Sequence, residues 1–307
     1  MPAHYKNSAA AISTFSSGCL GWVSSNSVAF NDIYEPSKIA QGTKYKILGE
    51  TALMLTICAR CGKQASSLEY NSILTAFRAA IERLRAPSED AYSNIRLLLS
   101  FTLALEANGF PADRFREGIS RLLRQNLLCL RDQTPWGILA LTYFLDLCGM
   151  PHDLPRNNEL YYWSILRSRP PLHFLSTHDK YALSHLLFFL GDFGARKEFF
   201  LKQPDYDLLS NYIDEVTTSC LIDEDWDLLG EFLIGYECIG ESKSQIQDYA
   251  WERYLAHQKP GGEIEAPRRV LKKYIASERE TKENFELYYH QTLIGIIAST
   301  LYSCHHG

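Results

Sequence analysis

Apolar residues recur at steps of three and four along most of this 307-residue chain, which is the spacing of α-helices. Short alternating runs of β-branched residues between hairpin turns are absent, so the pattern predicts an all-α protein. The helices form pairs in which the first member is amphipathic and charged and the second is more apolar. The predicted pairs are 8–23 with 46–61, 67–85 with 90–108, 111–127 with 135–148, 156–167 with 177–193, 204–216 with 223–239, and 243–256 with 278–303.

Glycines follow the apolar helices at a near-constant interval. They recur every 40 to 47 residues, at Gly62, Gly109, Gly149, Gly194 and Gly240. A glycine after a helix readily takes the left-handed conformation that ends it. Five of them at this spacing indicate a repeated helix pair.

The second helices are apolar nearly all round, as in residues 183–193, and such helices are buried on every side. We therefore predict one domain over residues 1–307, an (α/α)6 toroid of six helical hairpins with the apolar helices inside. An open α-solenoid of helix pairs is the alternative. A polar loop is expected at 24–43. An insertion is expected at about 259–277, with a short basic helix over 267–276.

Composition excludes several classes of protein. The net charge of −5 argues against nucleic-acid binding. No apolar run reaches the roughly 18 to 20 residues that cross a bilayer, and residues 9–23 make a poor signal peptide, so we expect a cytoplasmic protein without a membrane partner. The Cys58–Cys61 pair lacks a second pair at zinc-like spacing, and motifs for phosphate, dinucleotide or metal binding are missing. We therefore predict neither a metal nor a cofactor, and the sequence gives no oligomeric state.

Candidate chemistry follows from the expected ring, because the N-terminal ends of its inner helices would meet at one mouth. The first cluster there is His178, Asp179, Tyr181 and His185. A histidine beside a carboxylate and an apolar wall suits proton transfer near neutral pH. The alternative is a helix cap at Asp179 followed by a core histidine.

Two further clusters belong to the same mouth. Asp223, Asp225 and Asp227 precede Glu231, and Asp227 and Glu231 are one helical turn apart, so that one of them could retain a proton. Acidic residues in a helix first turn are the alternative, but Glu231 lies within an apolar run and needs a partner. The third cluster comprises Glu286, Tyr289, His290 and Thr292. Glu286 and His290 are four positions apart, so they could act as a base and its orienting residue or form a structural pair.

These clusters lie in phrases that resemble a known family. Residues 181–194 (YALSHLLFFLGDFG), 225–240 (DWDLLGEFLIGYECIG) and 288–298 (YYHQTLIGIIA) resemble an uncharacterised bacterial all-helical family linked to specialised-metabolite gene clusters and similar to (α/α)6 toroid enzymes. The resemblance implies no established activity. It favours the three clusters as functional.

We therefore hypothesise an enzyme of natural-product biosynthesis that performs metal-free cyclisation, isomerisation or elimination on a small apolar or aromatic substrate. His185 and His290 would be its acid and base, Asp227 and Glu231 its carboxylate pair, and Tyr181 and Asp179 additional catalytic groups. The expected binding residues are His178, Asp225, Tyr289, Trp136, Phe189, Glu286 and Tyr92. A non-catalytic helical-repeat interaction protein is one alternative. A glycan-acting toroid hydrolase or lyase, with two acidic residues in a cleft, is another.

Overall fold

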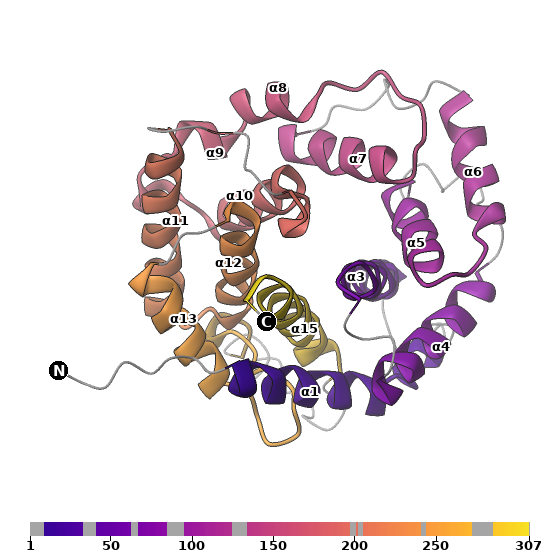
Figure 1. The fold of residues 1–307 in the computed structure, drawn as a ribbon, viewed down its shortest axis with the longest axis horizontal. Helices are drawn as coiled ribbons and strands as arrows, with labels where there is room; N and C mark the ends of the chain where they lie inside the picture. Colours follow the sequence, from indigo (N-terminus) through magenta and orange to yellow (C-terminus); the bar gives the residue numbers. More distant parts are fainter. Residues whose placement is uncertain are drawn as a thin grey trace. The chain divides into compact units, whose positions relative to one another are not determined.

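The structure is a computed structural model that describes residues 9–32, 41–62, 67–84, 95–124, 134–196, 201, 205–240, 244–271 and 285–306. The protein is all-α (Figure 1), as the three- and four-residue spacing predicts. In the described part of the chain the only β-type pairing is one isolated antiparallel bridge between Gln258 and Ile264. Within these residues, no helix combines the length and apolar character needed to cross a membrane.

The chain divides into two compact units. The continuous unit comprises residues 24–162, and the discontinuous unit comprises residues 1–23 together with 163–307. The arrangement of all six hairpins in one toroid domain stays a prediction. Each unit is therefore described separately.

The continuous unit is built from three apolar helices, each covered by a more polar one. Helix α3 packs against α5, and α5 against α7, while α4 covers α3, α6 covers α5 and α8 covers α7. Two of these helices have side-chain caps at their N-termini, since Ser67 caps α4 and Thr134 caps α7, with Pro135 in its first turn. The helices are α2 (Ala29–Asp32), α3 (Gln41–Arg60), α4 (Leu68–Glu82), α5 (Ile95–Ala107), α6 (Asp113–Arg124), α7 (Pro135–Leu147) and α8 (Asn157–Tyr162).

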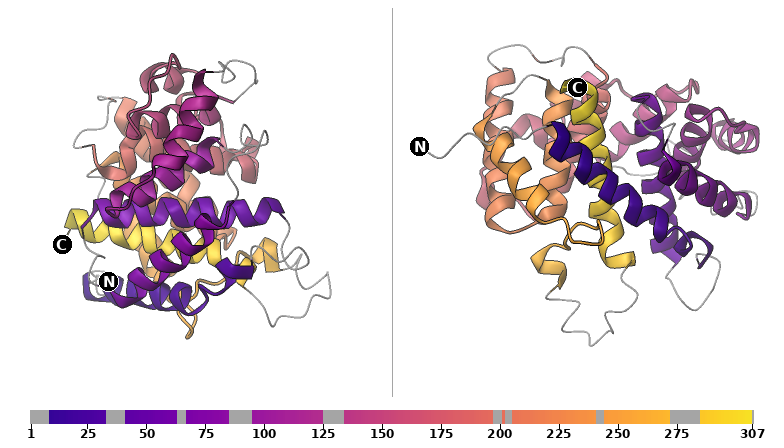
Figure 2. Two further views of the ribbon diagram at one scale, coloured as in Figure 1. Left: turned by 90° about the vertical axis from the view of Figure 1, so that its right-hand side faces the viewer. Right: turned by 60° about the horizontal axis from the view of Figure 1, so that its bottom comes forward.

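The discontinuous unit repeats this pattern. Helix α12 packs between α10 and α15, while α11 and α13 cover its outer side. Figure 2 shows α1, in indigo, beside α15, in yellow, where Trp22 stacks on Phe285. The elements are α1 (Ala9–Ser25), α9 (Ile165–Ser168), the 3₁₀ turn η3 (Leu172–Phe174), α10 (Thr177–Gly191), η4 (Asp192–Gly194), α11 (Asp205–Ile222), α12 (Trp226–Ile239), α13 (Gln245–Ala256) and α15 (Phe285–His306).

The apolar helices α10, α12 and α15 run in the same direction. Their first two turns are linked by side-chain contacts of Tyr181, Asp227 and His290. Their last turns are linked where His305 contacts Glu237 and where Gly191 touches the backbone of Cys238. Every residue of α12 is buried, which confirms the burial predicted from its apolar pattern.

All five repeat glycines have positive φ angles, between 62° and 87°, a region that favours glycine over residues with a side chain. One helix end departs from the predicted form. Helix α10 stops at Gly191, and two non-glycine residues, Asp192 and Phe193, take left-handed angles before Gly194. This end of α10 packs closely on α12, where a side chain at Gly191 would overlap the carbonyl of Cys238.

Several predicted boundaries are wrong. The helix expected at 156–167 breaks after Tyr162 because Ser164 is extended and starts a new helix. Helix α11 continues to Ile222, so the second helix of that pair begins at Trp226 instead of at 223. The loop expected at 24–43 is helical at residues 29–32 and again from 41, and residues 33–40 lie outside the described chain. Of the predicted basic helix, residues 268–271 are helical, and 272–276 lie outside the described residues.

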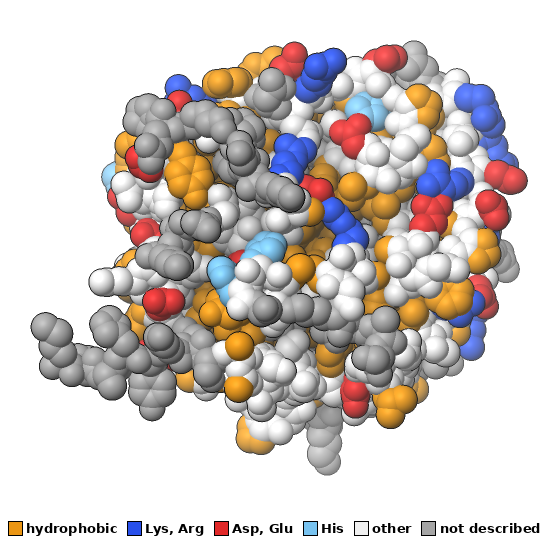
Figure 3. All heavy atoms as spheres, viewed as in Figure 1, with side chains coloured by type: hydrophobic (Ala, Val, Ile, Leu, Met, Phe, Trp, Pro, Cys, Tyr) orange, Lys and Arg blue, Asp and Glu red, His pale blue; other side chains and the backbone are white. Residues whose placement is uncertain are grey.

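One face of the protein mixes both signs of charge. On the face drawn in Figure 3, the basic and acidic side chains shown in colour are interspersed instead of forming separate patches. Mixed charges of this kind give no single-signed field that would attract a polyanion.

Candidate functional site

The candidate site is centred on the first two turns of α12. Asp225 caps this helix, since its Oδ1 accepts a hydrogen bond of 3.3 Å from the backbone N–H of Leu228. Asp227 and Glu231 follow one turn apart and are 6% and 1% exposed. Two carboxylates this deeply buried need partners that offset their lost hydration. Those partners come from α10, α15 and the segment after α13.

Helix α10 supplies three side chains to the carboxylates. The Tyr181 hydroxyl donates a hydrogen bond of 2.5 Å to Asp227 Oδ2. The Ser184 hydroxyl donates to Glu231 Oε2, and His185 Nδ1 lies 3.8 Å from the same oxygen. Residues 181, 184 and 185 are three and four positions apart, so they lie on one face of the helix.

The tautomer of His185 follows from one contact. Its Nδ1 lies 2.6 Å from the carbonyl oxygen of Tyr181, and a carbonyl only accepts hydrogen bonds. Nδ1 therefore carries the hydrogen, and Nε2 is the basic nitrogen of the neutral ring. The His185 side chain is 32% exposed, which makes it the most exposed of the groups that contact Glu231.

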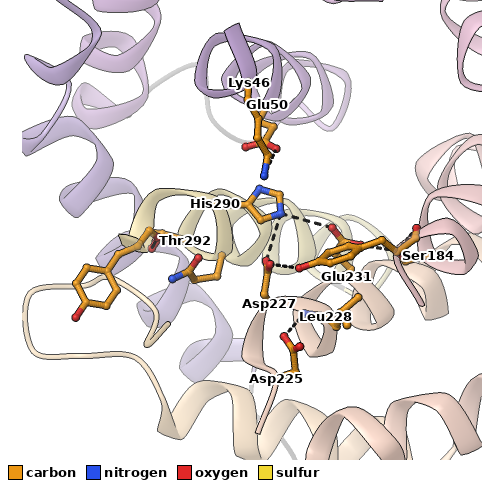
Figure 4. A network of polar contacts seen from close by, with 12 residues as sticks. Lys46, Glu50, Ser184, Asp225, Asp227, Leu228, Glu231, His290 and Thr292 are labelled. Carbon is orange, nitrogen blue, oxygen red and sulfur yellow. Dashed lines mark hydrogen bonds and ion pairs between the residues drawn. The ribbon is translucent and has the colours of Figure 1, made fainter. Parts of the chain in front are cut away.

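Helix α15 places His290 between the two carboxylates, as Figure 4 shows. The His290 Nε2 atom lies 3.3 Å from Asp227 Oδ1 and 3.6 Å from Glu231 Oε1. A small residue makes this approach possible. Gly230 lies against Tyr254 and Ile294, and a methyl group there would come within 2.8 Å of Ile294. The close packing of α12 on α15 thus brings the imidazole within reach of both acids.

An arginine after α13 completes the network. Arg269 Nε donates to Asp225 Oδ2 at 2.7 Å, and its Nη2 donates to the Tyr181 hydroxyl oxygen at 2.8 Å. A continuous series of polar contacts therefore runs from Arg269 through Tyr181, Asp227 and His290 to Glu231.

The surroundings of the two carboxylates shift their pKa values in opposite directions. Burial alone would raise the pKa of Glu231, but His185, His290 and the Ser184 hydroxyl outweigh it and hold that pKa below its usual range. Burial raises the pKa of Asp227, and the neighbouring Glu231 charge raises it further, against the opposing effects of His290 and Tyr181. Glu231 is thus the residue that stays ionised, and Asp227 is the one that tends to retain a proton.

Tyr181 is held as a neutral hydrogen-bond donor. Burial, followed by the charges of Asp227 and Glu231, raises the pKa of its hydroxyl well above the usual value. Its hydroxyl hydrogen therefore remains available to Asp227 at any ordinary pH.

The structure brings together five predicted residues, one or more from each of the three clusters: Tyr181, His185, Asp227, Glu231 and His290. It also places Asp225 beside them, bound to Arg269.

Asp179 and His178 lie apart from this group, at the start of α10. The Asp179 carboxylate accepts hydrogen bonds from the Ser176 backbone N–H, at 2.8 Å, and from its hydroxyl, at 2.6 Å. The two residues form a capping box, and these bonds lower the pKa of Asp179. His178 is exposed. The contacts of Asp179 are those of the helix cap that the sequence offered as the alternative.

The remaining predicted binding residues have other environments. Glu286 is exposed and makes no ion pair with His290 among the described residues. Tyr289 is buried and stacks on Phe285, and Phe189 is buried against Phe193. Trp136 belongs to the continuous unit, where Arg96 lies 5.8 Å from its ring. Tyr92 lies outside the described residues.

Two members of the network were not predicted. Ser184 had one usable signal, because it is a hydroxyl inside an apolar run and follows Tyr181 by three positions. Arg269 falls in the basic helix predicted over 267–276, but nothing in the sequence indicates that this helix reaches the first turn of α12. Among the described residues, no group of three or more His, Cys, Asp or Glu side chains has an arrangement that could hold a metal ion.

Comparison with known proteins identifies a family. The model of the family described as "Domain of unknown function (DUF6895)" matches residues 16–300. No curated protein and no solved structure matches the chain.

Proposed function

Since the chain belongs to the DUF6895 family, whose description names no activity, we propose its function from the site alone: an enzyme that performs general acid/base chemistry with its own side chains. The observation that carries this proposal is the carboxylate pair that shares His290. Asp227 and Glu231 lie one turn apart, and their environments shift their pKa values in opposite directions. Pairs of titratable groups separated in this way are typical of acid/base catalysts.

Each group has a role in the proposed proton transfers. His185 would exchange a proton with the substrate through Nε2, because its Nδ1 is held by the Tyr181 carbonyl. Glu231, 3.8 Å away, would stabilise the imidazolium that forms. His290 and Asp227 would supply or store the second proton, at 3.3 Å from each other. Tyr181 would hold Asp227 in place instead of donating to the substrate.

The apolar surroundings of the network support a small apolar or aromatic substrate. Phe188 and Phe189 lie on the helix that carries His185, with ring centres 5.5 and 6.3 Å from the imidazole. Proton removal at one atom and delivery at another is common to cyclisation, isomerisation and elimination. These reactions fit a biosynthetic role in bacterial specialised metabolism, which we include in the proposal.

Complementation tests this function even while the substrate is unidentified. The gene is deleted in its host, the small molecules that accumulate or disappear are recorded by mass spectrometry, and the deletion is complemented with variants. We expect the wild-type gene to restore the metabolite profile and Glu231→Gln and His185→Gln to fail, because loss of an acid/base group slows turnover by about 10²- to 10⁴-fold.

A matched control is Glu265→Gln. This residue also pairs with a histidine, His257, at 2.8 Å, but it does not contact the network. It should complement as well as the wild type. Full complementation by both Glu231→Gln and His185→Gln would refute the proposed function.

A non-catalytic interaction protein is the second candidate, supported by exposed aromatic residues in the discontinuous unit. Trp163 and Phe174 are 64% and 71% exposed, and exposed aromatic side chains often contribute most to binding a protein partner. In the same complementation experiment this function predicts the opposite pattern: Trp163→Ala and Phe174→Ala would fail, and Glu231→Gln would succeed.

A further inference from the structure

Arg269 lies in a short segment that is anchored to the helices of the discontinuous unit. After α13 the chain turns at residues 259–262 and pairs Gln258 with Ile264. The backbone N–H of Ile264 then donates to Thr292 Oγ1 of α15 at 3.1 Å, and Gln258 Nε2 donates to the Phe15 carbonyl of α1 at 2.8 Å. This segment therefore sets the position of Arg269 above the first turn of α12.

The hydrogen bonds of Arg269 fix the orientation of the Tyr181 hydroxyl. A guanidinium only donates, so the Tyr181 oxygen must accept the 2.8 Å hydrogen bond from Arg269 Nη2. The hydroxyl has one hydrogen, and it is directed to Asp227 Oδ2, 2.5 Å away. Asp227 Oδ2 thus accepts a hydrogen bond, and the other oxygen, Oδ1, faces His290 Nε2 at 3.3 Å.

We propose that Arg269 is a positioning residue for Asp227: through Tyr181 it reserves Oδ2 as an acceptor, makes Oδ1 the oxygen that holds the proton of Asp227, and so directs that proton at His290. The proton transfer is balanced within the pair. The Oδ1–H bond breaks, its electrons remain on Asp227, and a new N–H bond forms at Nε2 of neutral His290. The product is an imidazolium between two carboxylates, Asp227 and Glu231. The catalytic use of this proton rests on the proposed function, but the positioning itself does not.

The charged and titratable groups around Asp227 determine what the loss of Arg269 should do. They are Tyr181 on α10, the cap residue Asp225 before α12, Glu231 on α12, Tyr254 on α13, His290 on α15, and Arg269 itself. Without Arg269, the Asp225 charge is no longer neutralised by its partner at 2.7 Å, and the Tyr181 hydroxyl is free to turn away. Both changes disfavour an ionised Asp227, so its pKa should rise.

The test is a titration of Asp227 in the full-length protein by ¹³C NMR, with labelled aspartate and with Asp227→Asn to assign the resonance. We expect Arg269→Gln to raise the measured pKa of Asp227 by about one pH unit, as for loss of a nearby compensated charge. The adjacent Arg268→Gln is the matched control. Arg268 pairs with Glu224 at 3.2 Å on the surface and does not contact Tyr181, so its loss should leave the pKa unchanged.

Two further variants separate geometry from charge. Arg269→Lys keeps the charge but lacks the fork that reaches both Asp225 and Tyr181, so we expect it to raise the pKa of Asp227 as well. In a Tyr181→Phe background, Arg269→Lys should change the pKa of Asp227 much less than in the wild type, because the group through which it acts is gone. Circular dichroism shows whether Arg269→Gln folds. If it does not fold, Arg269→Lys serves as the test.

Any of three results would overturn the positioning role. The pKa of Asp227 could be unchanged in Arg269→Gln, or unchanged in Arg269→Lys. Arg269→Lys could also shift the pKa of Asp227 equally with and without the Tyr181 hydroxyl. These results are independent of turnover. A shifted pKa combined with full complementation by both Glu231→Gln and His185→Gln would leave the positioning role standing and refute the enzyme. An unchanged pKa of Asp227 combined with failed complementation by Glu231→Gln and His185→Gln would refute the positioning role and leave the enzyme standing.

Discussion

The packing of α12 on α15 gives a sharp prediction at Gly230. A methyl group at this position would overlap the Tyr254 hydroxyl and would lie 2.7 Å from Tyr254 Cζ and 2.8 Å from Ile294 Cγ2. Contacts this short force the neighbours to move. The Tyr254 hydroxyl donates to the Gln291 carbonyl at 3.1 Å inside the core, so displacing it also endangers a buried hydrogen bond.

The magnitude follows from three opposing contributions. Overpacking a core costs about 1–3 kcal/mol. A buried polar group that loses its partner costs about 1–3 kcal/mol more. Replacing glycine by alanine inside a helix returns about 1 kcal/mol. The expected result for Gly230→Ala is a net loss of roughly 1–5 kcal/mol in the free energy of unfolding.

Gly21 provides a control of opposite sign. It lies within helix α1 of the same discontinuous unit, and a methyl group there would meet nothing within 4 Å. Gly21→Ala should therefore stabilise the protein by about 0.5–1 kcal/mol. Urea unfolding followed by circular dichroism compares both variants with the wild type, and amide hydrogen exchange of α12 and α15 assigns the loss to this contact. If Gly230→Ala is as stable as Gly21→Ala, the two helices do not pack tightly at this point.

Two further outcomes are expected. Folding raises the pKa of Asp227, so the stability that this residue contributes is complete below its unfolded pKa of about 3.9 and is lost as pH rises through the folded pKa. The free energy of unfolding of Asp227→Asn should therefore increase relative to that of the wild type with rising pH. The increase should be about 1.4 kcal/mol for each pH unit between the two pKa values. Urea unfolding across a pH series measures this gain, and a relative loss with rising pH would mean that Asp227 is ionised in the folded state. Burial raises the pKa of the Cys148 thiol to about 12, whereas Cys304 is exposed, so iodoacetamide should modify Cys304 first. Peptide mapping by mass spectrometry measures the order of modification. Equal rates at the two cysteines would contradict the burial of Cys148.

The helix ends show what local sequence could predict. Ser67 and Thr134 are residue types that cap helices, and both do so here, because capping depends on a few neighbouring atoms. The end of α10 could not be predicted, since left-handed angles at Asp192 and Phe193 are locally unfavourable and are held by contacts with α12. The break after Tyr162 in the helix predicted at 156–167 likewise has no counterpart in the hydrophobic periodicity of the sequence.

In the candidate site, too, contacts set by local spacing were predictable and contacts set by the packing of distant segments were not. Asp227 and Glu231 were predicted as a pair because their spacing alone places them on one helical face. His290 and Tyr181 were predicted in separate clusters, and their meeting depends on which helices are neighbours. Arg269 lies in the short helical stretch 268–271, but its contacts with Asp225 and Tyr181 depend on the path of residues 257–267 before it, for which hydrophobic periodicity has no information.

The discontinuous unit joins residues that are far apart in the chain. Residues 1–23 belong with residues 163–307, and Gln258 bonds to Phe15 across 243 positions. During synthesis from the N-terminus, α1 therefore emerges long before α13 and α15, against which it packs. The continuous unit has all its residues available first and can fold while α1 waits with its apolar face uncovered. From this connectivity we expect α1 to contact chaperones early and to dock onto α15 in a slow final step.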